Sequence, residues 1–347
     1  MRGRRRWGEG GWMDRLGYDV RERLLVSTRT PQRRHALLRL GLGDADLRRL
    51  VRRGTLRHHH GHYVDGRLDE ELAPVACAQA AYPGSVVSHF SAARLAGIPV
   101  WTDRSRAGSV PMGATWLTRP PEAPRNQRRA DIVVRRAGLA PVDLSGHGWL
   151  PVTGVARTVV DLARELPLRE SIVTVDGALR SGTTIEELHA VAERQHHWPG
   201  IRRAQHAIAF GNPSAESALE SIARVRFAAA GLPAPLLQVQ FFDGLTWMLE
   251  RVDFWWPWFR TVGEADGLAK YEANSPAERR QLLRRSHRRD QRIGDRGVEL
   301  VHFGWEDVVD PRSDLIARLR AGFARGVSRT TELPQWRAVP PPHADAA

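Results

Sequence analysis

Lysine is almost absent from this chain of 347 residues. Of its 52 lysine and arginine residues, only Lys270 is a lysine. Because arginine supplies positive charge everywhere else, this one ammonium indicates a site that needs a compact point charge rather than a planar guanidinium. A solvated lysine retained by chance is the alternative interpretation. The neighbouring residues favour a role for Lys270 in chemistry, since the best candidate catalytic carboxylates lie shortly before it in the sequence.

Cysteine and long apolar segments are scarce too. The lone Cys77 excludes an intramolecular disulfide framework, fits a reducing cytoplasm and is predicted to be a small core residue. No apolar run approaches the roughly 20 residues of a membrane-spanning helix. The basic start of the chain, Met1 to Arg6, has no apolar segment behind it. We therefore expect a cytoplasmic protein with neither a membrane span nor a secretory signal.

Negative charge is in deficit, because 39 Asp and Glu residues stand against 52 Lys and Arg residues and leave a formal net charge of +13. An excess of this size predicts a polyanionic partner, most simply double-stranded DNA. The length of the chain and its 42% hydrophobic residues predict two or three domains, each with a core of its own.

Residues 1–66 predict a winged helix-turn-helix domain. Thr30 and Pro31 are typical of the N-cap and first residue of a helix, and a second helix over residues 45–53 and a hairpin over residues 55–64 follow it. The arginines that project away from the apolar stripe of the second helix are expected to contact DNA: Arg48, Arg49, Arg52 and Arg53. A helical scaffold with a solvated arginine face is the alternative.

The middle and the end of the chain carry no concentration of chemical groups. Residues 67–209 predict a mixed α/β connector domain, in which Thr184 and Glu187 form a capping-box pattern at the start of a helix. The proline-containing residues 323–347 predict a disordered tail. With the two outer domains, the whole chain is predicted to have a mixed α/β fold.

Residues 210–322 have a different pattern of predicted elements. They predict a helix over residues 213–231 and a meander of three strands over residues 238–265. A long arginine-rich helix over residues 276–294, a strand over residues 298–303 and a closing helix to about residue 319 follow. The arginines of the long helix either follow a phosphate backbone or form a solvated helix face. The tryptophans of the meander are predicted to pack in the core: Trp255, Trp256 and Trp258.

Acidic residues recur on two neighbouring strands of this meander. Asp253 lies at the end of one strand and Glu264 lies in the next, so both carboxylates can meet at one edge of the sheet. Asp266 shares the face of Glu264, because side chains alternate along a strand. Hard carboxylate oxygens that converge in this way suit Mg²⁺, which binds substrate phosphate directly.

The pattern Asp253…Glu264-Ala265-Asp266-Gly267, preceded by the segment from Ser214 to Ser217, resembles the PD-(D/E)XK nuclease superfamily. The similarity is closest to its very-short-patch-repair-like endonuclease branch. The resemblance implies a restriction-endonuclease-like core that cleaves or nicks DNA with Mg²⁺, or with Mn²⁺ in its place. It also implies that Asp253 and Glu264 are metal ligands and that Glu216 is a helix-borne carboxylate. Residues 20–66 resemble, less specifically, the winged-helix domain of AbiEi-type antitoxins.

The sequence departs from the superfamily pattern two residues after Glu264, where Asp266 replaces the usual lysine. A displaced lysine is known in this superfamily, and Lys270 is the candidate in this chain. The implied catalytic set is Glu216, Asp253, Glu264, Asp266 and Lys270. The alternative function is a non-catalytic transcriptional regulator, or an antitoxin with a toxin partner and a degenerate nuclease core. Asp266 favours this regulator, whereas Lys270 favours the enzyme.

Overall fold

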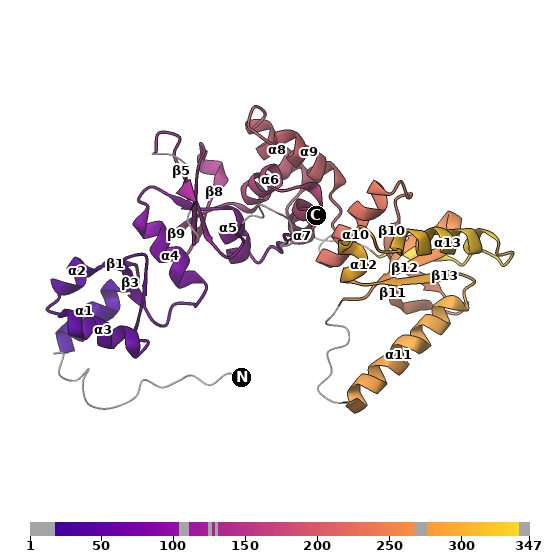
Figure 1. Cartoon of the computed structure of the whole chain (residues 1–347), viewed down its shortest axis with the longest axis horizontal. Helices are drawn as coiled ribbons and strands as arrows, with labels where there is room; N and C mark the ends of the chain where they lie inside the picture. Colours follow the sequence, from indigo (N-terminus) through magenta and orange to yellow (C-terminus); the bar gives the residue numbers. More distant parts are fainter. Residues whose placement is uncertain (1–17, 104–110, 124–126, 129–130, 268–275, 340–347) are drawn as a thin grey trace. The chain divides into compact units, whose positions relative to one another are not determined.

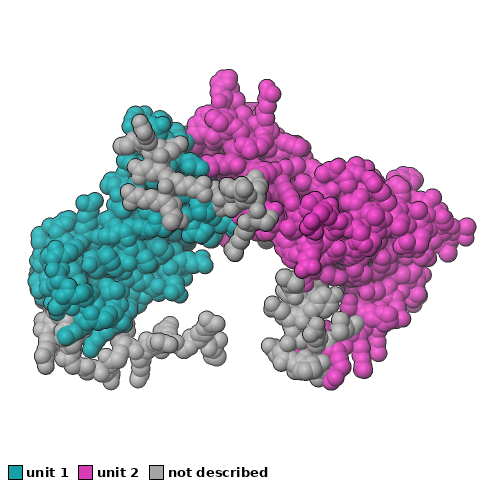
Figure 2. Space-filling model, in the orientation of Figure 1, with its two compact units in different colours: residues 1–95, 111–154 teal, residues 96–110, 155–347 magenta. Residues whose placement is uncertain are grey.

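The protein has a mixed α/β fold, as the sequence predicted (Figure 1). The computed structural model describes residues 18–103, 111–123, 127–128, 131–267 and 276–339. The chain forms two compact units, residues 1–95 with 111–154 and residues 96–110 with 155–347 (Figure 2). The predicted connector domain, residues 67–209, is therefore divided between the two units. Its strands pair with one another in the first unit, whereas its last four helices pack together in the second.

The first unit begins with the element order of a winged helix-turn-helix. The elements are α1 (Tyr18–Ser27), β1 (Gln32–Arg33), α2 (Arg34–Leu38), α3 (Asp44–Arg52), β2 (Leu56–His59) and β3 (His62–Asp65), with the strands in the order β1-β3-β2. Apolar side chains from all three helices pack in one core, which contains Leu24, Leu37, Leu47, Leu50 and Leu56. The second predicted helix and the hairpin are confirmed within two residues.

The start of the first predicted helix was wrong. The helix α2 begins at Arg34, because Gln32 and Arg33 instead pair with Tyr63 and His62 as the short strand β1. Backbone pairing with β3 thus overrides the N-cap pattern of Thr30 and Pro31.

The rest of the first unit is a sheet of six strands with two helices. The strands are β4 (Val86–Val87), β5 (Thr115–Arg119), β6 (Gln127–Arg128), β7 (Ile132–Arg136), β8 (Leu144–His147) and β9 (Leu150–Thr153), in the order β6-β7-β5-β4-β9-β8. The helices are α4 (Leu72–Ala81) and α5 (His89–Leu95). Cys77 is fully buried in α4, which confirms it as a core residue.

The second unit starts with four helices, α6 (Val155–Glu165), α7 (Leu168–Arg180), α8 (Ile185–Arg194) and α9 (Ile201–Phe210). The predicted capping box of α8 is confirmed, because the Glu187 N–H donates to Oγ1 of Thr184 and the Thr184 N–H donates to Oε2 of Glu187. Arg224 of the next helix donates to Oδ2 of the buried Asp176 in α7, at 2.8 Å. This ion pair ties the four helices to the part of the unit that carries the candidate site.

A five-stranded sheet forms the rest of the second unit. Its elements are α10 (Ala218–Ala229), β10 (Leu236–Phe242), β11 (Trp247–Trp256), β12 (Thr261–Ala265), α11 (Pro276–Gly294), β13 (Glu299–Phe303), α12 (Trp305–Val309), α13 (Leu315–Val327) and β14 (Trp336–Ala338). The strand order is β13-β12-β11-β10-β14, with β12 and β13 parallel and the other neighbours antiparallel. The predicted meander, long helix and later strand are confirmed.

The structure differs from the predicted disordered tail. The helix α13 continues past residue 323 to Val327, and β14 pairs with β10 so that Trp336 lies opposite Phe241. The open edge of β10 supplies the backbone partners that this proline-containing segment needs. Residues 340–347 lie outside the part of the chain that the structure describes.

Helices cover the two faces of this sheet. On one face, Phe227 of α10 contacts Phe254 and Trp256. On the other, Ile293 of α11 packs in a cluster with Trp255 and Val262, and the start of α11 extends beyond the strands (Figure 1). The prediction for the tryptophans is confirmed for Trp255 and Trp256, which are buried, and wrong for Trp258, which lies outside the sheet and is 90% exposed.

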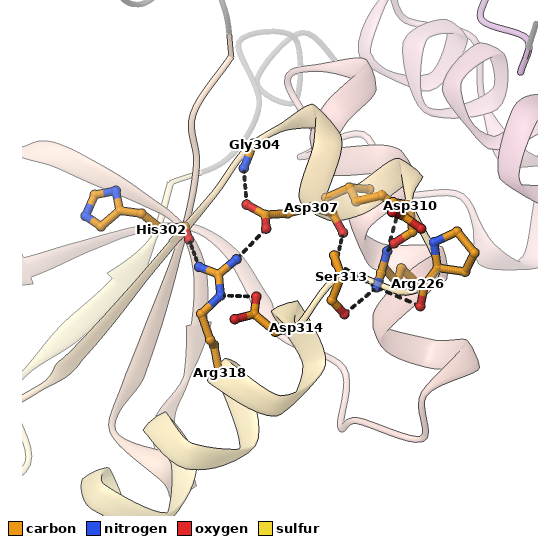
Figure 3. Close-up of polar contacts among 10 residues, drawn as sticks. Arg226, His302, Gly304, Asp307, Asp310, Ser313, Asp314 and Arg318 are labelled. Atoms are coloured by element: carbon orange, nitrogen blue, oxygen red, sulfur yellow. Dashed lines mark hydrogen bonds and ion pairs between the residues drawn. The ribbon is translucent and has the colours of Figure 1, made fainter.

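Two arginines fix the segment after β13 (Figure 3). Arg226 of α10 donates to the carbonyl of Asp310 and to Oγ of Ser313. Arg318 of α13 donates to the carbonyl of His302 at 2.7 Å and to Oδ1 of Asp307 at 2.5 Å. These bonds satisfy carbonyls that the strand and helix leave open, and they hold β13 in place beside β12. Within the described residues, no helix is both long and apolar enough to cross a membrane.

Candidate functional site

A cleft of about 690 Å³ lies where α11 faces strands β10 and β11. Its lining combines carboxylates with arginines: Glu216, Glu250, Asp253 and Asp266 on one hand, and Arg251, Arg285, Arg288, Arg289 and Arg292 on the other. Gln238, Leu282 and Ser286 complete it. Three of the predicted catalytic residues, Glu216, Asp253 and Asp266, therefore line one cleft.

Glu216 is not on a helix, contrary to the prediction. The helix α10 begins at Ala218, and its N-cap is Ser217, whose Oγ accepts a hydrogen bond from the Glu220 N–H at 3.2 Å. Because a serine N-cap starts the helix at this point, Glu216 precedes it. Its carboxylate forms a bidentate ion pair with Arg251, at 2.7 and 3.0 Å.

The carboxylate that α10 does carry toward the site is Glu220, which is 5% exposed. Its Oε2 accepts from the Glu216 N–H at 2.9 Å and from Nε2 of Gln238 at 3.0 Å, and its Oε1 accepts from Oγ of Ser217 at 2.7 Å. Burial and, after it, the nearby charge of Asp253 raise the pKa of Glu220 to about 7. Sequence reasoning gave Glu220 no role. The signal was the spacing Ser217-x-x-Glu220, which predicts a helix start there.

Gln238 is held in an unusual backbone conformation. Its φ is 50°, in the left-handed region, although it lies within strand β10 and is buried. Such a conformation costs a residue other than glycine about 1–2 kcal/mol, and strain of this kind gathers at functional sites. Here it accompanies the hydrogen bond from Gln238 to Glu220. No sequence pattern pointed to this residue.

Asp253 and Glu264 meet across the pair of strands β11 and β12. Oδ2 of Asp253 accepts a hydrogen bond from the Ala265 N–H at 2.8 Å. Glu264 is completely buried, and Nη2 of Arg289 donates to both of its oxygens, at 3.0 and 2.9 Å. The same Nη2 donates to the carbonyl of Arg251 at 2.7 Å. Sequence reasoning placed Arg289 on an arginine face and did not predict its bond to Glu264.

Asp266 directly follows β12 and contacts a histidine. Nδ1 of His302 lies 2.9 Å from Oδ2 of Asp266, and its Nε2 lies 3.3 Å from Oδ2 of Asp290. The hydrogen bond to Asp266, more than any other contact, raises the pKa of His302. The position two residues after Glu264 thus holds an acid beside a histidine whose pKa is raised. His302 was not among the predicted site residues.

The other predicted residues belong to the first unit, to α11 or to a segment outside the described residues. Lys270 belongs to the segment 268–275, which the structure does not describe. The predicted DNA-contacting residues are exposed in the first unit, with Arg48, Arg49 and Arg52 on α3 and Arg53 at its C-cap. Among the α11 side chains that the structure describes, the exposed arginines are Arg280, Arg284, Arg285, Arg288 and Arg292.

The carboxylates fit a divalent cation in kind. Asp253 and Glu264 supply the hard oxygen atoms that Mg²⁺ and Mn²⁺ prefer. Glu220 lies near enough to Asp253 for the charge of Asp253 to raise the pKa of Glu220. The arrangement is nevertheless not that of a closed metal site, because Arg289 is bonded to both oxygens of Glu264. No cluster of three or more His, Cys, Asp or Glu side chains within the described residues is arranged to hold a metal ion.

Comparison with known proteins identifies relatives. No family model matches the chain. Two proteins of Mycobacterium tuberculosis, the uncharacterized proteins MT2308 and Rv2248, are each 34% identical to it over 205 residues, which are 57% of this chain and 68% of each relative.

Proposed function

The chain belongs to the same family as the mycobacterial proteins MT2308 and Rv2248, and we propose that it is a DNA-binding protein whose second unit cleaves or nicks phosphodiesters with a divalent metal ion. The observation that carries this proposal is the position of Asp253 and Glu264 on the paired strands β11 and β12, beside a cleft whose described lining includes five arginines. Carboxylates alone would repel DNA. Carboxylates beside a cationic lining suit an anionic backbone and a metal ion together.

The residues that line the cleft and the buried carboxylates next to it would have different roles. Arg285, Arg288 and Arg292 would bind phosphates on either side of the scissile bond. Asp253 and Glu264 would hold the metal ion, which, when bound, polarises the phosphodiester and makes water a stronger nucleophile. Glu220, with a pKa of about 7, is suited to accept a proton from that water near neutral pH. Gln238 orients the Glu220 carboxylate through its hydrogen bond.

The first unit would supply most of the affinity for double-stranded DNA. Its exposed arginines on α3 lie on the helix that, in a winged helix-turn-helix, enters the major groove. We place the protein in the cytoplasm, where its one thiol would stay reduced. Burial raises the pKa of Cys77 to about 12, so this thiol is protonated and unreactive at neutral pH.

One contact favours the alternative function, a non-catalytic regulator or antitoxin with a toxin partner. Arg289 neutralises Glu264, and an arginine fixed at a metal ligand is what a degenerate nuclease core would carry. This alternative predicts DNA binding without cleavage under any metal condition.

A nicking assay tests the proposal. Supercoiled plasmid is incubated with the full-length protein in Mg²⁺, in Mn²⁺ or in EDTA. Nicking is expected with the metals and not with EDTA, and Asp253→Asn and Glu264→Gln should each abolish it. Glu250→Gln is the matched control, since Glu250 lies on the same strand as Asp253, lines the cleft and pairs with Arg292 instead. Absence of nicking by the parent protein with either metal would favour the regulator.

A further inference from the structure

Arg289 occupies the carboxylate that the proposed function assigns to the metal ion. Its Nη2 bonds to Oε1 and Oε2 of Glu264 and to the carbonyl of Arg251. The Arg289 side chain is 23% exposed and lines the cleft, whereas the Glu264 side chain is 0% exposed. One end of the ion pair is thus buried under the sheet surface, and the other faces the space where a substrate would lie.

A divalent ion and this guanidinium compete for the same two oxygens. Arg289 fills two of the roughly four lone-pair sites of the Glu264 carboxylate, and its positive charge repels a second cation that approaches the same oxygens. We therefore expect a metal ion that binds Glu264 to displace Arg289 from it. Arg289 can leave Glu264 only if the metal ion replaces it, because a buried carboxylate without a cation is strongly unfavourable.

The helix that carries Arg289 allows such an exchange. One turn later, Ile293 is 1% exposed and packs in the core below the sheet, so this end of α11 is anchored. Arg285 and Arg288, on the preceding turn, are exposed and line the cleft. A change of side-chain rotamer is enough to turn the Arg289 guanidinium from Glu264 toward these neighbours, with the backbone of α11 in place.

We propose that Arg289 is the exchangeable counter-ion of Glu264. A divalent cation takes its place at the carboxylate, and the released guanidinium binds a phosphate of the nucleic acid in the cleft. Arginine suits this second role because its planar fork matches a phosphate group with two hydrogen bonds. The inference rests on the proposed function and adds that metal and nucleic acid bind cooperatively through one residue.

Cooperativity of this kind is reciprocal. If the metal ion makes Arg289 available to DNA, then DNA that holds Arg289 makes Glu264 available to the metal ion by the same factor. Without nucleic acid, the parent protein should therefore bind divalent ions weakly, because each ion must first separate Arg289 from Glu264. The site would load its metal ion chiefly when substrate is present.

Calorimetry with Mn²⁺ alone gives the first test. Arg289→Gln removes the competing cation and should bind Mn²⁺ on the order of 10-fold more tightly than the parent, within the usual range of coupling between sites. Arg289→Lys should be intermediate, since one ammonium cannot reproduce both sets of hydrogen bonds. Arg284→Gln is the matched control, because Arg284 is exposed on the same helix and does not line the cleft. Equal or weaker Mn²⁺ binding by Arg289→Gln overturns the inference, since a residue that merely positions Glu264 would have that effect.

Binding of duplex DNA with and without Ca²⁺, an oxygen-binding ion used here as a probe, gives the second test. Ca²⁺ should tighten binding to the parent by about 5-fold or more and should give a clearly smaller gain with Arg289→Gln. An equal gain in both proteins overturns the role of Arg289 in phosphate binding.

Circular dichroism and thermal melting show whether the variant is folded, because Arg289→Gln removes a cation bonded to a buried carboxylate. If that variant does not fold, Arg289→Lys decides, and Mn²⁺ binding no tighter than in the parent overturns the inference. The two proposals fail in different ways. If the parent nicks DNA with metal ions but the variants do not bind Mn²⁺ more tightly, only the role of Arg289 is overturned. If neither the parent nor any variant nicks DNA or binds Mn²⁺, both proposals are overturned.

Discussion

Gln238 donates a hydrogen bond to Glu220 over 3.0 Å while its own backbone is held at a φ of 50°. The two residues come from different elements, β10 and α10, and both are buried. A strained backbone persists only where the surrounding structure holds it in place. The strained conformation of Gln238 therefore lowers the stability of the fold slightly, and it orients the carboxylate of Glu220 near that of Asp253.

Replacing Glu220 should change how the stability of the protein depends on pH. The pKa of Glu220 is about 7 in the folded protein, against a usual value of 4.5, so the folded state binds this proton more tightly than the unfolded state. The resulting stabilisation is complete below about pH 4.5 and is lost as the pH rises through 7. Urea unfolding of the parent should show this loss, on the order of 3 kcal/mol between these limits, and Glu220→Gln should lack it.

The comparison of the parent with Glu220→Gln separates the contribution of Glu220 from that of His302. The raised pKa of His302 gives a loss of stability in the same direction as the pH rises, but it is present in both proteins. The difference between parent and variant in the free energy of unfolding should therefore change with pH. A constant difference between pH 5 and pH 8 would show that Glu220 titrates normally.

Periodic patterns in the sequence predicted the elements well. The leucine stripe of α3 and the strands of the hairpin gave correct elements, because each pattern already shows which side chains are buried. The meander from β10 to β12 was equally clear. Asp253 and Glu264 were placed correctly on neighbouring strands, since short connections leave consecutive strands paired.

Contacts between distant segments could not be predicted from such patterns. The choice between Glu216 and Glu220 depends on where α10 begins, and helix boundaries are the least certain part of a sequence pattern. The bond between Arg289 and Glu264 depends on how α11 packs on the sheet. The pairing of β14 with β10 joins segments about 100 residues apart, and the composition of residues 323–347 indicated only a disordered tail.

The arginines of α3 should carry the salt-dependent part of DNA binding. In the variant Arg48→Ala, Arg49→Ala, Arg52→Ala, affinity for duplex DNA should fall, and the slope of log affinity against log salt should decrease by roughly 0.9 for each phosphate that the variant no longer neutralises. Fluorescence anisotropy over a range of salt concentrations measures both. Alanine at Arg194, Arg202 and Arg203, exposed on α8 and α9, is the matched control. An unchanged slope in the α3 variant would move the DNA site elsewhere, with α11 the next surface to test.

The one lysine provides a test that needs no structural detail. If Lys270 supplies a point charge beside the scissile phosphate, Lys270→Arg should lose nicking activity nearly as fully as Lys270→Ala, because a guanidinium is wider and spreads its charge. Mn²⁺ binding and duplex binding should be unchanged in both, so the loss should fall on kcat. Single-turnover nicking at saturating protein measures it. Full activity of Lys270→Arg would make Lys270 a surface charge.

A pair of matched variants decides which carboxylate near the start of α10 serves the reaction. The Glu216 side chain is 33% exposed and paired with Arg251, and ion pairs as exposed as this contribute roughly 0–1 kcal/mol to stability. Glu216→Gln should therefore keep nicking within a few-fold of the parent rate. Glu220→Gln cannot accept a proton and should lose on the order of 100-fold or more. Initial nicking rates between pH 6 and pH 9 are the measurement, and in the parent they should rise through the pKa of Glu220. A greater loss with Glu216→Gln than with Glu220→Gln would return the catalytic role to the residue that the sequence first indicated.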